Sequence, residues 1–179
     1  APKPGWTDTT AHLGVRFVPG FKGPGLKVRD VLPDGPADRE ASRIKPNEII
    51  THIDGKKVDP ETNLVTMLTG RLDRDMVLKV QSGVRRKKQV REVMLRPISY
   101  ASARSRLYEK WIRDSRAAVD KFSASKLGYL HIRGMNMSSF FRFEEELYSV
   151  GAGKDGIIID VRENGGGFTT DHLLTILTQ

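Results

Sequence analysis

The chain contains no cysteine, and this absence excludes a disulfide framework, a thiolate nucleophile and a cysteine-based metal site. Metal-ligand spacing is also missing among the four histidines, which are His12, His52, His131 and His172. We therefore expect neither a metal nor another cofactor. No apolar run reaches the length of a membrane-spanning helix, so we expect no membrane span.

The composition is that of an ordinary globular protein, with 38% hydrophobic and 29% charged residues in a chain of 179. A formal charge of +8 raises the question of nucleic acid. The only basic run is Arg85-Arg86-Lys87-Lys88. No aromatic residues interleave with it, and it lies between two strand-like segments, which favours a solvated hairpin tip. We expect no nucleic-acid partner.

A strand followed by three glycines dominates the second half of the chain. The apolar residues of 157–161 predict a strand buried on both faces, as in parallel sheets. Gly165, Gly166 and Gly167 follow, and glycines let backbone amides converge on one point. Thr169 or Thr170 is a plausible helix cap, with Asp171 in the first turn. The pattern predicts donors at a helix N-terminus that could hold an anion or an oxyanion. It does not match the spacings of nucleotide-binding loops.

Short strands separated by turns are expected over residues 12–97. Alternating polarity predicts strands at 12–18, 26–32, 49–53, 56–58, 76–80 and 90–95. Asp54-Gly55 is typical of a two-residue hairpin turn. We expect a short helix near 37–42 and a second helix that opens at Pro60-Glu61 and ends at Gly70.

This succession closely resembles a PDZ domain. The resemblance lies in Leu13-Gly14-Val15-Arg16-Phe17, in Gly35-Pro36-Ala37 and in the block from Ile44 to Val58. The last block departs from the family pattern with Asn47 and Glu48, and asparagine tolerates the same left-handed turn.

The resemblance implies a peptide-binding site. A peptide would pair with the strand from Val15 to Val18, and its terminal carboxylate would meet the amides of the loop. The implied site residues are Leu13, Gly14, Val15, Arg16, Phe17, Leu64 and Leu68. Leucines at this helical spacing are equally typical of a core, so both roles stay open for Leu64 and Leu68.

A long amphipathic helix is predicted over Tyr100–Phe122, with Leu107, Trp111, Ile112 and Phe122 on its apolar face. Acidic residues interleave with the basic ones, which favours a connector packed on a second domain over a membrane-surface helix. A strand at 127–132, a helix at 138–148 and the strand before the glycines then indicate a parallel crossover.

The segments Lys126–Ile132 and Ile158–Gly167 resemble the catalytic domain of tricorn-type and carboxy-terminal processing serine proteases. That resemblance implies an oxyanion hole built from the amide of Gly166, with Gly165 or Gly167 as neighbours. It places the nucleophile and the base outside these residues. His12 stands near the position of the family's catalytic histidine, but it leads directly into the PDZ loop, which argues against a catalytic role. We expect Asp160 and Arg162 to orient the glycine turn rather than act as an acid pair.

We therefore expect an α+β chain: a linker at 1–10, a PDZ-like β-sandwich or partial barrel with two helices at 11–98, and at 99–179 a connector helix with an incomplete βαβα part of a protease core. The chain would be a fragment of a tricorn-like serine endopeptidase, inactive alone. A non-catalytic PDZ scaffold that binds peptides is the alternative. Implied partners are a peptide or unfolded-protein substrate, the remainder of the parent protease and a possible homo-oligomer. Bacterial relatives of this type are often exported, which favours the periplasm or another exported location.

Overall fold

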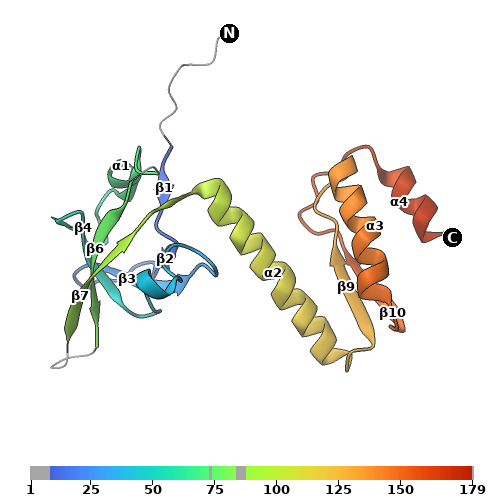
Figure 1. The fold of residues 1–179 in the computed structure, drawn as a ribbon, viewed down its shortest axis with the longest axis horizontal. Coiled ribbons are helices and arrows are strands. Elements are labelled where there is room, and N and C mark those ends of the chain that lie inside the picture. The colour runs from blue at the N-terminus through green and yellow to red at the C-terminus, as the bar shows by residue number, and fades with distance from the viewer. Residues whose placement is uncertain (1–8, 73, 84–87, 179) are drawn as a thin grey trace, which may run out of the picture. The chain divides into compact units, whose positions relative to one another are not determined.

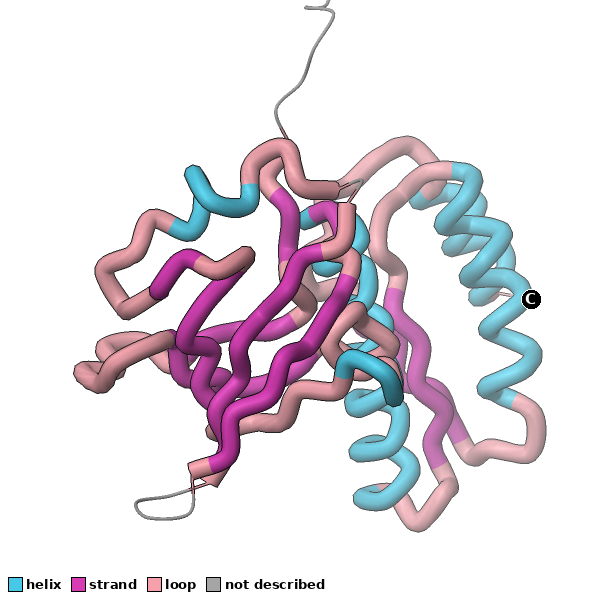
Figure 2. Tube along the Cα trace, turned by 60° about the vertical axis from the view of Figure 1, so that its left-hand side comes forward, coloured by secondary structure: helices cyan, strands magenta, loops and turns pink. Residues whose placement is uncertain are grey.

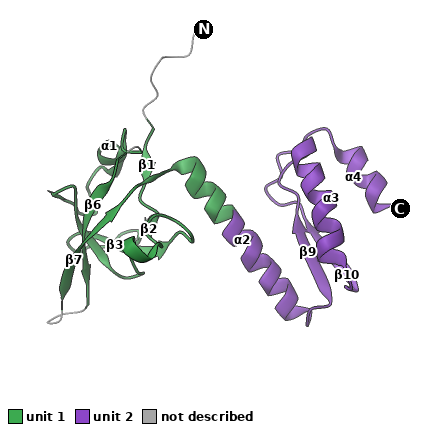
Figure 3. Cartoon of the chain, in the orientation of Figure 1, with its two compact units in different colours: residues 1–108 green, residues 109–179 purple. Residues whose placement is uncertain are grey.

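A computed structural model describes residues 9–72, 74–83 and 88–178 (Figure 1). Most of the expected linker and residues 85–87 of the basic run lie outside the described residues. The chain forms two compact units, residues 1–108 and 109–179, and helix α2 (Tyr100–Phe122) contributes to both (Figure 3). The domain boundary that we expect between residues 98 and 99 stays a prediction.

The first unit is built on a six-stranded sheet, shown in Figure 2. Its antiparallel order is β2-β3-β4-β6-β7, with β5 paired to β4. The strands are β2 (Val15–Phe17), β3 (Leu26–Val31), β4 (Ile49–Ile53), β5 (Lys56–Lys57), β6 (Met76–Ser82) and β7 (Gln89–Leu95). β2 and β7 end this path without pairing to each other, so the described strands form an open PDZ-like sheet and no closed barrel.

The expected strand at 12–18 is divided in two. Its first part, β1 (Ala11–His12), pairs with β8 (Ile98–Ser99), and its second part is β2. The chain turns at Gly14, whose φ is +82°, a value that favours glycine. A Cβ at Gly14 would lie 2.7 Å from Cδ of Pro36. Gly14 therefore allows both the turn and the close approach of the Pro36 segment.

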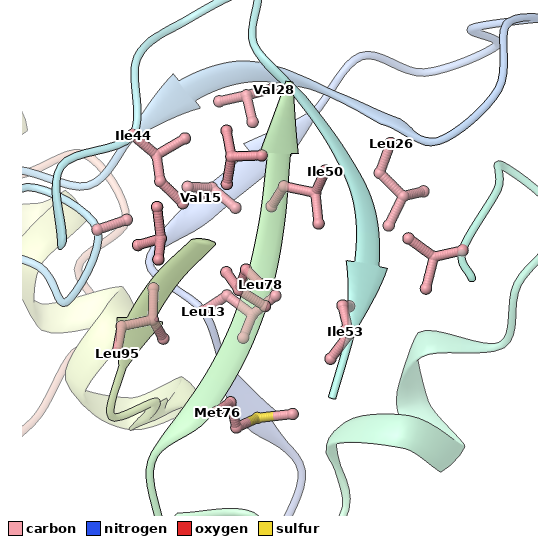
Figure 4. Close-up of a cluster of buried hydrophobic side chains, with 14 of the residues drawn as sticks. Leu13, Val15, Leu26, Val28, Ile44, Ile50, Ile53, Met76, Leu78 and Leu95 are labelled. Atoms are coloured by element: carbon pink, nitrogen blue, oxygen red, sulfur yellow. The ribbon is translucent and has the colours of Figure 1, made fainter. Parts of the chain in front are cut away.

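The core of the first unit lies between the sheet and the segments that cross it. Figure 4 shows some of its side chains, with Val28, Ile50 and Leu78 inside the cluster. These three side chains are fully buried. Alternate residues of β6 point inward, because Met76, Leu78 and Val80 are buried while Val77 is exposed. The period-two pattern that predicts these strands is confirmed.

The turns follow the local chemistry of the sequence. Asp54 and Gly55 have φ of +48° and +76°, and they join β4 to β5, as expected of a two-residue hairpin. Asn47 has φ of +70°, which confirms that asparagine adopts the left-handed conformation there.

Both predicted helices are shorter than expected: a 3-10 turn η1 (Glu40–Ser42) and α1 (Leu64–Leu68).

Helix α1 does not open at Pro60-Glu61, so that prediction is wrong. Asn63 is its N-cap, and the side-chain oxygen of Asn63 accepts the amide of Thr66 at 3.2 Å. The preceding residues form a separate turn, in which the Oδ1 of Asp59 accepts the amide of Glu61 and the hydroxyl of Thr62. The helix begins after Asn63 rather than at Pro60, because the asparagine side chain accepts a hydrogen bond from a backbone amide of the first turn.

The second unit contains a parallel pair of strands, β9 (Leu127–His131) and β10 (Gly156–Asp160), as the crossover pattern predicts. Helices α3 (Met137–Gly151) and α4 (Thr170–Leu177) pack on this pair through Leu130, Phe143, Ile157, Ile159 and Leu173. Figures 1 and 2 show α3 lying along the two strands. The glycine turn joins β10 to α4.

Two expectations about burial in this unit are wrong. The strand expected at 157–161 is not buried on both faces, because Ile158 in β10 is 41% exposed and Val161, just after β10, is 52% exposed. Among the described residues, β10 pairs only with β9, so part of its surface stays uncovered. Phe122, placed on the apolar face of α2, is 85% exposed, whereas Ile112 on the same face is buried. The far end of α2 therefore buries less than its sequence pattern predicts.

Candidate functional site

The glycine turn presents its backbone on the surface of the second unit. Gly165, Gly166 and Gly167 are all exposed. The amide of Gly166 donates to Oδ1 of Asn164 at 2.7 Å, whereas the amides of Gly165 and Gly167 have no acceptor among the described residues. Use of Gly166 as an oxyanion donor therefore requires Asn164 to release it, and its two neighbours are already available.

Main-chain and side-chain bonds fix the turn against strand β9 and the segment after it. Nδ2 of Asn164 donates to the carbonyl of Ile132 at 2.8 Å. The amide of Met135 donates to the carbonyl of Gly166 at 3.1 Å, and the amide of Phe168 donates to the carbonyl of Met135 at 2.8 Å. The turn is thus held on both sides of its accessible amides.

Gly167 is required by close approach. Its φ is +147°, and a Cβ added there would lie 2.1 Å from the carbonyl oxygen of Met135. Real Cβ atoms do not approach a backbone oxygen so closely. Only glycine allows the turn to lie against Met135 in this way. At Gly165, by contrast, an added Cβ meets nothing within 4 Å.

A buried carboxylate anchors the strand end that leads into the turn. Asp160 accepts from the amide of Arg162 at 2.9 Å, from its guanidinium at 2.5 and 3.0 Å and from the hydroxyl of Tyr129 at 2.7 Å. The hydrogen bonds from Arg162 outweigh burial and hold the pKa of Asp160 far below its usual value. Asp160 is therefore an ionised anchor. This geometry supports an orienting role for Asp160 and Arg162 and gives no sign of an acid pair.

Aromatic residues complete the anchor. The guanidinium carbon of Arg162 lies 5.3 Å from the ring centroid of Trp111, and the Trp111 ring meets His131 edge to face at 4.8 Å. The buried His131 is 2.8 Å from the carbonyl of Arg162 through Nε2, which makes that nitrogen the donor. These contacts hold both the side chain and the main chain of Arg162.

Three residues of the site, Asn164, Tyr129 and His131, are not predicted as site residues from the sequence. An asparagine two residues before a glycine is typical of a side-chain turn, so Asn164 could have been found. Tyr129 and His131 offered no comparable pattern, because they meet Asp160 and Arg162 only through the parallel pairing of β9 and β10.

The expected helix cap after the glycines is only partly as predicted. Thr169 is the N-cap residue of α4 and Asp171 lies in its first turn. The Thr169 side chain makes no capping bond, and its buried hydroxyl has no hydrogen-bond partner among the described residues. The cap position is right, and the expected capping bond is missing.

The loop expected to bind a carboxylate lies between β1 and β2. Leu13 and Val15 are buried in the core, so the loop offers its main chain rather than these side chains. The amide of Gly14 donates to Nδ1 of His12 at 2.9 Å. β2 stands at one end of the sheet, and its outer edge pairs with no other described strand. A peptide strand therefore has an edge on which to add.

A groove of about 230 Å³ lies beside β2 and the segment before α1. It is lined by Phe17, Val18, Pro19, Gly20, Phe21, Gly25, Leu26, Lys27, Pro60, Thr62 and Leu64. Leu64 and Phe17 are half-buried beside the core, so they can contact a ligand. Leu68 is buried and can only support this wall from behind. Arg16 points to Asp30, with Nε 2.6 Å from Oδ1.

Among the described residues, no three histidine, aspartate or glutamate side chains gather closely enough to hold a metal ion. Within the same residues, no helix is long and apolar enough to cross a lipid bilayer.

Comparison with known families matches this arrangement. Residues 11–96 match the model of the PDZ domain, and residues 126–177 match the model of peptidase family S41. A stretch that matches the PDZ domain is therefore followed by a stretch that matches peptidase family S41. Its relatives are tricorn proteases, so the resemblance to this kind of serine protease is confirmed.

The similarity extends over most of the chain. It is 29% identical over 162 residues to tricorn protease homolog 1 of Streptomyces coelicolor, covering 86% of this chain and 15% of that protein. It is 25% identical over 127 residues to the tricorn protease of Thermoplasma volcanium, covering 71% of this chain and 12% of that protein. A crystal structure of the tricorn protease shares its fold, with a TM-score of 0.65 and 23% identity over 93% of this chain and 16% of that one. The chain thus spans a small part of these relatives.

Proposed function

We propose that the first unit binds the carboxy-terminal end of a peptide or unfolded protein and that the glycine turn supplies the oxyanion hole of a parent serine endopeptidase. We expect the chain alone to be inactive, because the resemblance to tricorn-type proteases places the nucleophile and the base outside these residues. One observation supports the proposed peptide binding: the edge of β2 that pairs with no other described strand adjoins both a glycine loop and an apolar groove.

The peptide would add to β2 as a further strand, with main-chain hydrogen bonds along its length. Its carboxylate would reach the amides of Leu13, Gly14 and Val15, and an apolar side chain would enter the groove beside Leu64. Arg16 lies on the same strand, and its guanidinium is paired with Asp30, so the main-chain amides of the loop are the donors proposed for the carboxylate.

Titration of the chain with labelled carboxy-terminal peptides and their amidated copies tests the binding half. Binding should be tighter for the free acid, because only a carboxylate exploits the loop amides. A matched control is an amidated peptide of the same composition in which an aspartate stands at an interior position instead of at the end. Equal affinity for the acid and the amide would disprove carboxylate recognition.

The proposed oxyanion hole is supported by the accessible backbone of the glycine turn, which hydrogen bonds on both sides hold in place. Such donors stabilise the oxyanion of the tetrahedral intermediate by about 3 kcal/mol each. In the parent endopeptidase, Gly167→Ala would displace the turn and lower kcat. Gly165→Ala adds a methyl group in open space, so a normal kcat there would show that the backbone position is what matters.

The rival function is a non-catalytic scaffold that binds peptides. A longer form of the protein distinguishes the two functions by its reaction with a serine-directed phosphonate. Covalent labelling of one serine outside this chain supports the endopeptidase. A longer form with full peptide binding and no labelling supports the scaffold.

A further inference from the structure

We propose that His12 determines when the loop between β1 and β2 accepts a carboxylate: the neutral ring occupies the Gly14 amide, and the protonated ring releases that amide and attracts the ligand. This inference rests on the proposed peptide-binding function and adds a residue that controls it.

The geometry defines the state of the ring. A backbone amide can only donate, so Nδ1 of His12 must be unprotonated where it lies 2.9 Å from the nitrogen of Gly14. The remaining proton is on Nε2, and the ring is neutral. Nδ1 therefore stands where an oxygen of a bound carboxylate would accept the same hydrogen.

The surroundings of the His12 ring favour its neutral form. His12 is in β1, which pairs with Ile98 and Ser99 of β8, neither of them charged. Tyr100, at the start of α2, meets the His12 ring edge to face at 5.1 Å. On β2, Arg16 is the charged neighbour, and it is paired with Asp30 of β3. Burial, and then the charge of Arg16, lower the pKa of His12 below its usual value.

Protonation reverses both parts of the arrangement. A proton on Nδ1 removes the acceptor and sets two donors against each other, so the Gly14 amide must separate from the ring. The same proton makes the ring a cation beside the loop. A carboxylate then gains a backbone donor and a charged neighbour in one step, whereas at neutral pH it must displace the ring.

Binding of one carboxy-terminal peptide and its amidated copy, measured by fluorescence anisotropy from pH 7.5 to 4.5, tests the proposal. Above pH 4.5 the terminal carboxyl of the peptide stays mostly ionised. For the chain as it stands, affinity for the free acid should rise about tenfold as the pH falls, and affinity for the amide should not.

Two variants separate His12 from other groups that titrate. His12→Gln keeps a polar side chain that cannot gain a proton, so its affinity for the free acid should be constant over this range. His52→Gln, a matched change in β4, should keep the full rise. A rise that persists in His12→Gln would overturn the proposal.

A measurement on the unaltered chain without ligand tests the proposal even if a variant fails to fold. In the unaltered chain, the amide shift of Gly14 should titrate by NMR with the same midpoint as the His12 ring. A Gly14 shift that stays flat while the ring titrates would overturn the proposal. A free acid preferred by the same ratio at every pH overturns only the role of His12, whereas equal binding of acid and amide at every pH overturns the peptide-binding function itself.

Discussion

The amide of Gly166 donates to the side-chain oxygen of Asn164, two residues earlier in the chain, at 2.7 Å. The amide of Gly14 makes the same kind of bond to Nδ1 of His12, also two residues earlier, at 2.9 Å. In both units, therefore, a glycine amide proposed to bind substrate is held by a local side chain. A ligand must compete with that internal acceptor, so these two side chains influence how readily each site is used.

Replacing Asn164 with alanine should remove two hydrogen bonds, one to Gly166 and one to Ile132. We expect a loss of about 1–2 kcal/mol in the free energy of unfolding. We also expect hydrogen exchange at the Gly166 amide to become at least about tenfold faster. Asn164→Asp keeps the acceptor for Gly166 and loses only the donor to Ile132. Unchanged protection of Gly166 in Asn164→Ala would contradict the assignment.

Gly167→Ala should destabilise the second unit by more than about 3 kcal/mol, because the new Cβ would press on the carbonyl of Met135 and the residue would keep a positive φ. Gly165→Ala is the matched control and should cost less than about 0.5 kcal/mol. Urea unfolding of both variants, followed by far-ultraviolet circular dichroism, compares them. Similar midpoints for the two variants would show that the turn can move away from Met135.

The Asp160 anchor should make the second unit sensitive to acid. Its folded pKa lies below that of an unfolded aspartate, so the stabilisation is present at neutral pH. It should begin to decline near pH 4, where an unfolded carboxyl takes up its proton, and disappear below the folded pKa. Asp160→Asn should flatten the fall in unfolding free energy between about pH 5 and pH 2. Asp120→Asn, on an exposed carboxylate, should leave it steep.

Tyr129→Phe removes the hydroxyl that donates to Asp160 at 2.7 Å and leaves the ring in place. The carboxylate is buried, so we expect a loss of about 1–3 kcal/mol at neutral pH, measured by urea unfolding. Tyr148→Phe provides a control, because Tyr148 is 70% exposed on α3. Equal stability of the two variants would mean that Arg162 alone satisfies Asp160.

Leu64→Ala should weaken the binding of a carboxy-terminal peptide about tenfold, because Leu64 lines the groove beside β2. Val65→Ala is the matched control, since Val65 is 59% exposed and lies outside the groove lining. Fluorescence anisotropy with one labelled peptide compares the two. If both variants bind like the unaltered chain, the peptide does not occupy this groove.

Local patterns in the sequence predicted most of the elements correctly. Alternation along Met76–Val80 predicts a strand because side chains of a strand point to opposite faces, and the structure buries Met76 and Leu78 while exposing Val77. Asp54-Gly55 predicts its hairpin because both residues tolerate positive φ. The glycines at 165–167 predict a turn with accessible amides, and they are exposed. These outcomes depend on residues that are neighbours in the chain.

Relationships between residues that are far apart in the chain depend on the tertiary structure. The pairing of β9 with β10 brings Tyr129 to Asp160, residues that no local pattern connects. The same pairing, with no further strand beside β10 among the described residues, exposes Ile158 although its sequence predicts burial. The hydrogen bond from Gly14 to His12 is local. The environment of the His12 ring depends on Arg16 and Tyr100, which the sheet and α2 bring to it. Sequence fixes backbone preference within a few residues, whereas burial and charge environment depend on which segments the fold brings together.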